Sequence, residues 1–307
     1  MKVSIIIPFF NASSTIERCI KSAISQTYKN IEIICVDNNS TDDSVKIIQD
    51  YIKNYQHITL YTELRKGANF ARNLGTKKAS GCWLNFLDAD DFISEKKIEN
   101  QVKALKTKSP FIASSYYYVY LHGDKRKHKI KYLDAWKDLF SGNLGITSSN
   151  LFKKTNVIEV GMWNEDYNSS QEAELMFKII KRYGAPLFME NEFETTIYEQ
   201  KTSISNSNKG ELLRIFLKLR ILMYEYLYKF ENKYFQREKY WYHNQLLAII
   251  LEYYRFNKIF SIKTYNTFLH KNISIYKCMT FKRSILVLLV KCFGFGFCAS
   301  IYSKVKK

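Results

Sequence analysis

The first hundred residues alternate between short apolar runs and longer segments with helical spacing. Residues 3–7, 31–36 and 82–87 are nearly continuous aliphatic or aromatic runs, which suits strands that are covered on both faces. Residues 16–24 and 45–52 instead repeat apolar side chains every three or four positions. This alternation predicts βαβ units around a mostly parallel sheet, which is a Rossmann-like α/β fold.

The turns between these segments give further expectations. Pro8 should end the first strand, since proline cannot donate a hydrogen bond to a sheet. Polar residues over 11–14 offer a cap for the following helix, with Glu17 as its capping partner. Later strands are expected over 58–61, 111–120 and 146–152, with a basic return strand after Gly123, and later helices over 68–79 and 171–183.

A chain of 307 residues is longer than an average domain, and 46% hydrophobic residues are enough to bury a core. A stretch rich in Ser, Asn and Lys marks a boundary, so we expect an α/β domain over 1–205 and a basic helical region over 206–307. The six cysteines are widely spaced and form no C-x-x-C pair, which favours a reducing cytoplasm. The N-terminus does not have the apolar core of a signal peptide.

The positive charge is concentrated toward the C-terminus. The formal net charge is +18, and residues 206–307 hold 19 Lys and Arg against 5 Asp and Glu. A region with one sign of charge is typical of a protein that binds an anionic surface. Nucleic acid is not expected as the partner, because residues 1–205 are nearly neutral and contain no recognisable RNA- or DNA-binding module.

Acidic side chains follow two of the predicted strands. Asp88 and Asp90 come directly after the apolar run 83–87, and Asp37 follows 31–36. Open α/β sheets bind ligands at the carboxyl ends of their strands. Two carboxylates one residue apart can share Mg²⁺ or Mn²⁺, whose other ligands are usually substrate phosphates. The alternatives are a solvated turn for the acidic pair and a helix N-cap for Asp37.

Five segments, taken in their order and spacing, resemble glycosyltransferase family 2. They are Ser4–Asn11, Ser25–Tyr28, Val36–Asp42, Ala71–Asn73 and Phe86–Asp91. The resemblance covers about two-thirds of the chain, over residues 1–200. It implies a GT-A fold, a nucleotide-diphosphate sugar donor, Mn²⁺ or Mg²⁺ as cofactor, and inversion at the anomeric carbon.

The resemblance also implies roles for individual residues. Asp37 would contact the nucleotide base, Asp88 the ribose or the metal, and Asp90 the metal. The nucleotide-sugar site would comprise Pro8, Phe10, Asn11, Asp37, Arg72 and Asp88.

An inverting transfer needs a carboxylate that takes the proton of the attacking hydroxyl. The family supplies this base at the start of a helix, and the matching segment is Gln171–Lys178. Glu172 is the expected catalytic base, at a position where Asp is usual. Glu174 is the alternative if the match shifts by two residues, and both could simply be carboxylates favoured by the helix dipole. Lys178 replaces a common Arg, and Lys201 is the one cation near a position where relatives carry Arg or His.

The C-terminal region contains an apolar window over 284–303 that includes Lys291. Crossing a bilayer would place this lysine near the centre, at a cost of about 3 kcal/mol. A helix lying on an anionic membrane surface fits better, since cations flank the window on both sides. The alternative is an ordinary helix packed on the rest of the protein.

Together these features predict a metal-dependent, inverting glycosyltransferase, peripheral on the inner face of the cytoplasmic membrane. It would move a hexose or N-acetylhexosamine from a UDP-sugar to a hydroxyl of a surface glycan, such as a lipid-linked precursor of lipopolysaccharide or capsule. The alternatives are a transferase that acts on polyprenyl phosphate, a non-catalytic scaffold that binds membranes, and a nucleotidyltransferase.

Overall fold

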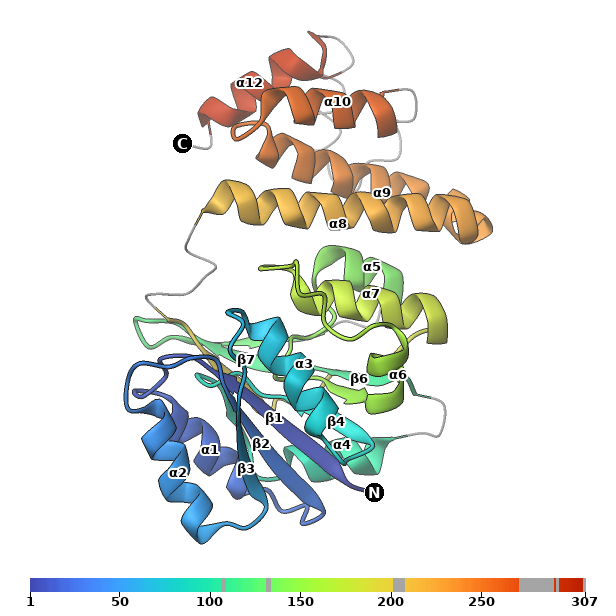
Figure 1. Ribbon diagram of the computed structural model, residues 1–307. Coiled ribbons are helices and arrows are strands. Elements are labelled where there is room, and N and C mark those ends of the chain that lie inside the picture. The colour runs from blue at the N-terminus through green and yellow to red at the C-terminus, as the bar shows by residue number, and fades with distance from the viewer. Residues whose placement is uncertain (106–108, 131–133, 201–207, 271–289, 291–292, 306–307) are drawn as a thin grey trace. The chain divides into compact units, whose positions relative to one another are not determined.

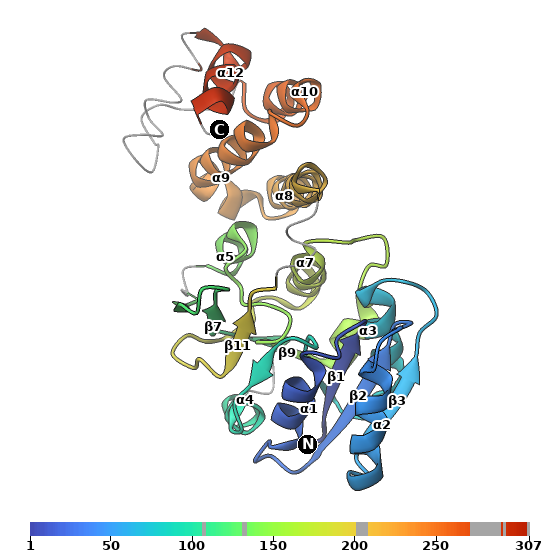
Figure 2. The ribbon, with the colours of Figure 1, turned by 90° about the vertical axis from the view of Figure 1, so that its left-hand side faces the viewer.

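The computed structural model describes residues 1–105, 109–130, 134–200, 208–270, 290 and 293–305. The chain divides into two compact units, Met1–Ser203 and Ile204–Lys307. The expected boundary between residues 205 and 206 lies outside the described residues. Figures 1 and 2 show the helices and strands of both units.

A seven-stranded sheet forms the centre of the N-terminal unit, in the order β10-β6-β9-β4-β1-β2-β3. Its strands are β1 (Val3–Phe9), β2 (Ile31–Asp37), β3 (Ile58–Thr62), β4 (Trp83–Phe86), β6 (Phe111–Ser114), β9 (Leu151–Lys153) and β10 (Leu187–Met189). Neighbouring strands pair in parallel, except that β9 is antiparallel to β4 and β6. The predicted mostly parallel sheet is therefore confirmed.

Helices cover both faces of this sheet. The described helices of this unit are α1 (Ile16–Ile24), α2 (Ser44–Asn54), α3 (Ala68–Lys78), α4 (Lys97–Ala104), α5 (Ala135–Ser141), α6 (Lys154–Glu159) and α7 (Gln171–Tyr183). Along β1, Ile5 and Ile7 pack in one core cluster with Ile20 of α1. Ile6 points the other way, toward α3, where a Cβ on Gly75 would come within 2.4 Å of its side chain. Glycine therefore lets α3 lie close to the sheet.

A second sheet has the strand order β5-β11-β7-β8. Its strands are β5 (Phe92–Ile93), β7 (Tyr116–Val119), β8 (Lys125–His128) and β11 (Thr195–Tyr198). β11 pairs antiparallel with β5 and parallel with β7, and β7 pairs antiparallel with β8. β5 comes directly after the acidic turn that ends at Asp91, so this sheet begins beside that turn.

The expectation that Pro8 ends the first strand was wrong. β1 continues through Pro8 to Phe9. Alternate residues of β1 bond to opposite neighbours: Leu87 N donates to Ile6 O on the β4 side, and Asn38 N donates to Phe9 O on the β2 side. Pro8 therefore faces the β4 side, where pairing has already ended, and its missing N–H removes no sheet hydrogen bond.

Two other expected strands also differ. The strand over 111–120 is two strands in different sheets, β6 and β7. Ser115 separates them, because its N–H donates to Met189 O (3.2 Å) while its Oγ accepts from Ile130 N (3.0 Å). The strand over 146–152 begins only at Leu151, since a turn precedes it in which Asn150 N donates to the carbonyl of residue 146 at 3.2 Å.

The expected capping of the first helix was also wrong. Thr15 is the N-cap residue of α1 and makes no capping hydrogen bond with its side chain. Glu17 instead forms an ion pair with Lys21 at 2.8 Å and accepts a hydrogen bond from Tyr51. Glu17 thus lies in the first turn of α1, but its side chain contacts the next turn rather than capping the start of the helix.

The C-terminal unit is helical in its described part, as predicted. It contains α8 (Lys209–Phe230), α9 (Asn232–Tyr253), α10 (Lys258–Phe268) and α12 (Phe295–Val305). Buried polar groups join the first two helices, where the Tyr224 hydroxyl lies 2.9 Å from His243 Nε2. None of the described helices is long and apolar enough to cross a membrane. The window over 284–303 lies partly outside the described residues, and its end forms part of α12.

Candidate active site

Asn11 joins the loops that follow β1 and β2. The two strands end side by side, with Phe9 opposite Asp37. The Asn11 side-chain oxygen accepts a hydrogen bond from Thr41 N at 2.8 Å, and Asn11 N donates to Ser40 Oγ at 3.1 Å. Asn11 has a φ of 47°, a left-handed conformation in which asparagine is enriched. The side chain therefore fixes the two loops at the carboxyl edge of the sheet.

Asp37 and Phe10 lie in this loop region in contrasting environments. Asp37 is buried, and its Oδ1 accepts from Ser40 N at 3.0 Å. It does not cap α2, whose N-cap residue is Asp43. Phe10 is 54% exposed, whereas Pro8 is buried within β1. An exposed ring near a buried carboxylate suits a flat, polar base, and the nucleotide-binding roles of these residues stay predictions.

The acidic turn after β4 is a closed backbone turn. Asp91 N donates to Asp88 O at 3.0 Å, and Asp88 N donates to Ser148 Oγ at 3.1 Å. The Asp88 side chain is partly exposed, while Asp91 is buried and accepts a hydrogen bond from the Ser148 hydroxyl. Asp91 therefore anchors the turn from inside, and Asp88 and Asp90 are the members that a ligand can reach.

Three carboxylates at one turn perturb each other. Burial raises the pKa of Asp90 to about 6, and the nearby Asp88 carboxylate adds to this rise. Burial together with Asp88 and Asp90 also raises the pKa of Asp91. Arg18 offsets part of the charge, since its guanidinium donates to Asp90 O at 2.5 Å. The turn thus has an excess of negative charge, which favours binding of a cation.

Arg72 joins the acidic turn to the start of α7. Its guanidinium lies 2.8 Å from the Asp88 carboxylate and donates to Gln171 Oε1 at 2.7 Å. It also donates to Asn69 Oδ1 at 3.1 Å and lies over the Trp163 ring, 4.7 Å from its centre. Because Arg72 is only 5% exposed, packing holds these contacts in one arrangement. Arg72 therefore links the acidic turn to Gln171, the residue before Glu172.

Two asparagines of α3 hold the segment that leads into α7. Asn73 Nδ2 donates to Trp163 O at 2.9 Å and to Glu165 Oε1 at 3.1 Å, while its Oδ1 accepts from Trp163 N at 3.0 Å. Asn69 Nδ2 donates to Asn164 O at 2.6 Å and to Tyr167 O at 3.0 Å. Sequence reasoning missed this role, although Asn73 belongs to one of the quoted motifs. The helix that carries Arg72 thus also positions the approach to Glu172.

Glu172 and Glu174 lie in the first turn of α7 but in different surroundings. Glu174 is buried, and it pairs with Lys178 at 3.1 Å. Burial raises its pKa, while Lys178 and Asn164 oppose that rise. In the part of the chain that the structure describes, no hydrogen bond or ion pair engages the Glu172 carboxylate. Glu172 is partly exposed, and its role as base stays a prediction. Lys201 lies outside the described residues.

The acidic turn offers few protein ligands for a metal. Within the described ranges, no group of three or more His, Cys, Asp or Glu side chains could hold a metal ion. Asp88 and Asp90 supply carboxylate oxygens only, and they carry excess negative charge. One or two carboxylates completed by substrate phosphates is the usual arrangement for Mg²⁺ bound with a nucleotide. The two residues therefore fit a hard divalent ion that arrives with a diphosphate.

The two sheets and the acidic turn define the class of fold, which is the GT-A fold. Staphylococcus aureus TarS, solved in complex with UDP-GlcNAc, aligns over 100% of this chain and 92% of its own with a TM-score of 0.65 and 13% identity. A mannosyltransferase from Pyrobaculum calidifontis, solved with GDP-Man and Mn²⁺, aligns over 99% and 86% of the two chains with a TM-score of 0.59 and 14% identity.

The family follows from the sequence match. Residues 4–181 match the model of glycosyl transferase family 2. The chain belongs to this family, and the resemblance seen in the sequence motifs is confirmed.

Curated relatives match a shorter part of the chain. One is the Escherichia coli UDP-Glc:alpha-D-GlcNAc-diphosphoundecaprenol beta-1,3-glucosyltransferase WfaP, 45% identical over 38% of this chain and 46% of that protein. Another is the cholesterol galactosyltransferase of Borreliella burgdorferi, 30% identical over 53% and 47% of the two chains. The chain therefore spans about half the length of these relatives.

Proposed function

We propose that this protein is an inverting glycosyltransferase that moves a sugar from a UDP-sugar to a hydroxyl of a lipid-linked surface glycan. The observation that carries the proposal is the bridge from Asp88 through Arg72 to Gln171, which links the acidic turn to the helix turn that carries Glu172. The relatives support the substrate classes: WfaP is named for UDP-glucose and a diphosphoundecaprenol acceptor, and TarS was solved with UDP-GlcNAc.

In the proposed reaction, Glu172 takes the proton of the acceptor hydroxyl as its oxygen attacks the anomeric carbon. The bond from that carbon to the diphosphate breaks, the new glycosidic bond forms on the opposite face, and UDP leaves. Mn²⁺ or Mg²⁺ held by Asp88 and Asp90 would neutralise the charge that develops on the diphosphate. Arg72 adds a fixed positive charge beside Asp88.

The donor nucleotide would lie at the ends of β1 and β2. Phe10 offers an exposed ring for the base, and the buried Asp37 offers an acceptor for its polar edge. Asn11 keeps the two loops together. Asn38, next to Asp37, accepts from Gly67 N at 2.7 Å and so ties this loop to the start of α3, which carries Arg72. The base and the diphosphate would therefore be held by one connected set of elements.

The decisive experiment is a donor screen with the purified full chain. UDP-, GDP- and dTDP-sugars are tested for release of nucleoside diphosphate, with and without Mn²⁺, and the anomeric configuration of the product is read by NMR. We expect release of UDP with Mn²⁺ and an inverted linkage. Release of pyrophosphate would indicate a nucleotidyltransferase, and absence of any metal-dependent UDP binding by calorimetry would indicate a non-catalytic scaffold.

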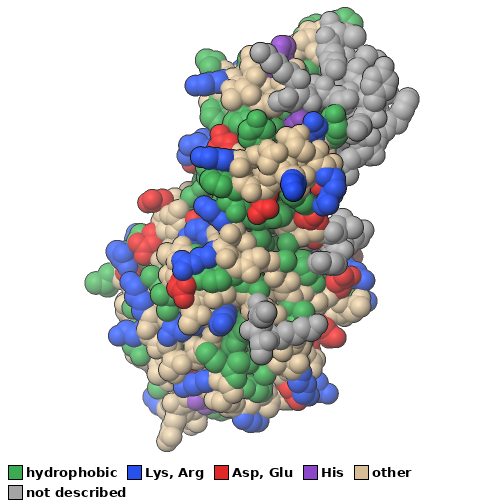
Figure 3. Space-filling model, turned by 90° about the vertical axis from the view of Figure 1, so that its right-hand side faces the viewer, with side chains coloured by type: hydrophobic (Ala, Val, Ile, Leu, Met, Phe, Trp, Pro, Cys, Tyr) green, Lys and Arg blue, Asp and Glu red, His purple; other side chains and the backbone are tan. Residues whose placement is uncertain are grey.

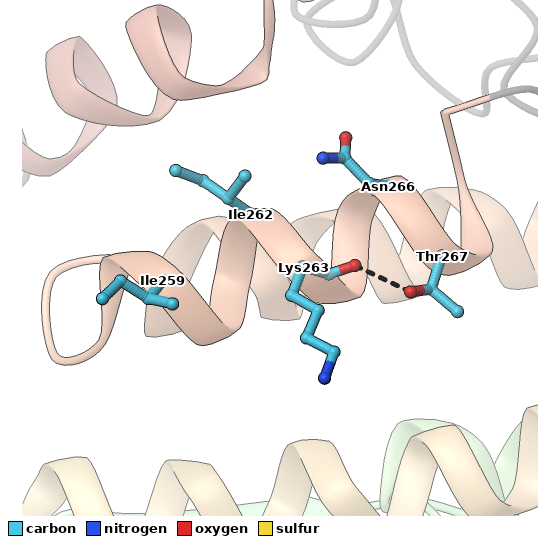
Figure 4. Close-up of a pocket in the computed structure, with 5 residues that line it drawn as sticks. All are labelled: Ile259, Ile262, Lys263, Asn266 and Thr267. Carbon is cyan, nitrogen blue, oxygen red and sulfur yellow. Dashed lines mark hydrogen bonds between the residues drawn. The ribbon is translucent and has the colours of Figure 1, made fainter.

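We also propose that the C-terminal unit binds an anionic membrane surface from the cytoplasmic side. Its α10 and α12 expose large apolar side chains, including Ile259 (82%), Phe297 (56%) and Ile301 (48%). A depression of about 570 Å³ lies on α10 and is lined by Ile259, Ile262, Lys263, Asn266 and Thr267, which Figure 4 labels. Exposed apolar side chains next to cations suit the boundary between lipid headgroups and acyl chains.

The positive charge of the C-terminal unit also supports binding to an anionic membrane. Residues 206–307 hold 19 basic against 5 acidic residues. In the upper part of Figure 3, Lys and Arg side chains, in blue, lie beside exposed hydrophobic side chains, in green.

Sedimentation with vesicles tests membrane binding. We expect the protein to bind vesicles that contain phosphatidylglycerol, and to bind them more weakly in high salt or after Ile259→Glu. Equal binding to neutral vesicles, or none at low salt, would contradict it.

A further inference from the structure

The β7–β8 hairpin presents one face that combines aromatic rings with a guanidinium. Residues directly opposite in an antiparallel pair share a face, and here Tyr116 lies opposite His128 and Tyr118 opposite Arg126. The rings of Tyr116 and His128 stack with centres 5.0 Å apart. The Arg126 guanidinium lies 5.0 Å from the centre of the Tyr120 ring. We name these five side chains the hairpin face.

The hairpin face lies beside the candidate active site. Burial raises the pKa of Tyr116 to about 12, and the charge of Glu172 adds to this rise. Burial also raises the pKa of Tyr118, with contributions from the carboxylates of Glu199, Asp90 and others nearby. The sheet order gives the same placement, since β5 follows the acidic turn and connects through β11 to β7.

Arg126 keeps its positive charge available. It is exposed, and within the described residues no carboxylate forms an ion pair with it. The carboxylates next to the hairpin have other partners: Asp124 pairs with His122 at 3.1 Å, and Glu199 accepts from Leu121 N at 2.9 Å. A guanidinium that is fixed over an aromatic ring and free of carboxylates suits bidentate binding of a phosphate.

We infer that the hairpin face binds the acceptor, with its sugar against Tyr116 and Tyr118 and its lipid-linked diphosphate on Arg126. The inference rests on the proposed function and adds where the acceptor binds. Tyr116 and Tyr118 are two residues apart on a strand, about 7 Å, which is comparable with one sugar unit. A sugar that lies along these rings therefore has a hydroxyl near Glu172 and its phosphate toward Arg126. Aromatic rings bind the apolar face of such a ligand.

The test compares two acceptors and two matched variants by calorimetry, with the donor site filled by UDP and Mn²⁺. The acceptors are an alkyl-diphosphate-linked N-acetylglucosamine and the same alkyl glycoside without phosphate. The variants are Arg126→Gln and Lys127→Gln, since Lys127 is the next residue of β8 and points to the opposite face. Both positions are exposed, so both variants should fold.

We expect the wild type to prefer the diphosphate acceptor. Arg126→Gln should weaken that binding about tenfold and leave the neutral glycoside unchanged, as the loss of one charge-assisted contact predicts. Lys127→Gln should change neither. Equal binding of both acceptors by the wild type would overturn the inference, as would equal effects of the two variants. Binding of poly(glycerol phosphate) more tightly than the diphosphate acceptor would also overturn it. Donor hydrolysis is measured in parallel and should be unchanged in Lys127→Gln; its absence in the wild type would instead overturn the proposed function.

Discussion

The guanidinium of Arg72 lies 2.8 Å from the carboxylate of Asp88. The same side chain donates to Gln171 Oε1 at 2.7 Å, so a single buried residue connects the end of β4 with the start of α7. Any movement of the acidic turn must therefore involve the helix that carries Glu172. Arg72 therefore couples the position of the acidic turn to that of α7.

We expect Arg72→Lys to lower kcat/KM for the donor about 10- to 100-fold. Lysine keeps the positive charge, but an ammonium cannot make the planar contacts to Asp88, Gln171 and Asn69 at the same time. Steady-state kinetics with the UDP-sugar measures the effect. Lys77→Gln is the matched control, since Lys77 is an exposed cation on the same helix. Wild-type kinetics in Arg72→Lys would show that charge alone is sufficient.

The two glutamates at the start of α7 should differ in catalysis. Glu172→Gln should lower kcat about 10²- to 10⁴-fold with donor affinity unchanged, because the amide cannot accept the proton of the hydroxyl. Glu174→Gln should lower kcat only a few-fold, since Glu174 pairs with Lys178 inside the protein. Single-turnover rates and calorimetric donor binding separate these effects.

Glu172→Asp supplies the control for the same position. It should recover part of the activity, because a carboxylate is restored with a side chain one methylene shorter. Full activity in Glu172→Gln would contradict a hydroxyl acceptor and would favour polyprenyl phosphate, which needs no base to deprotonate it.

The strands and helices up to residue 87 could be predicted because buried parallel strands and amphipathic helices leave a local pattern in the sequence. The bounds of α7 and the position of the acidic turn followed from the same pattern and from the family motifs. The split at Ser115 could not be predicted, since its cause is hydrogen bonding to Met189 and Ile130, far along the chain. Asn69 and Asn73 were missed for the same reason, because their partners lie about ninety residues away.

Asn73→Ala should lower the free energy of unfolding by about 2 kcal/mol. The substitution removes the hydrogen bonds to Trp163 N, Trp163 O and Glu165, and it leaves buried backbone groups of Trp163 without their partner. Urea unfolding measures the change. Asn54→Ala is the control, since the Asn54 side chain bonds at the exposed end of α2, and it should change stability by less than about 0.5 kcal/mol. Equal changes in the free energy of unfolding of both variants would contradict the role of Asn73 in positioning the segment that leads into α7.

Lys97→Met should stabilise the protein at pH 6 by more than about 1 kcal/mol. Lys97 is 1% exposed, and burial lowers its pKa to about 7, although Glu194 opposes this. In the unfolded chain the pKa is about 10.4, so between pH 7 and 10 the unfolded state binds a proton that the folded state does not, and wild-type stability rises with pH. Below pH 7 both states are charged and the full cost of the buried ammonium is present.

The advantage of Lys97→Met should therefore shrink steadily as the pH is raised from 7 to 10. Urea unfolding at pH 6, 8 and 9.5 measures it, and Lys96→Met, an exposed neighbour, should show no such dependence. The lost hydrogen bond from Lys97 Nζ to Gln101 Oε1, at 3.2 Å, lowers the stability of the variant by the same amount at every pH, so it shifts the difference without changing its slope. A difference between wild type and Lys97→Met that stays constant with pH would mean that the buried amine stays protonated throughout, so that burial does not lower its pKa.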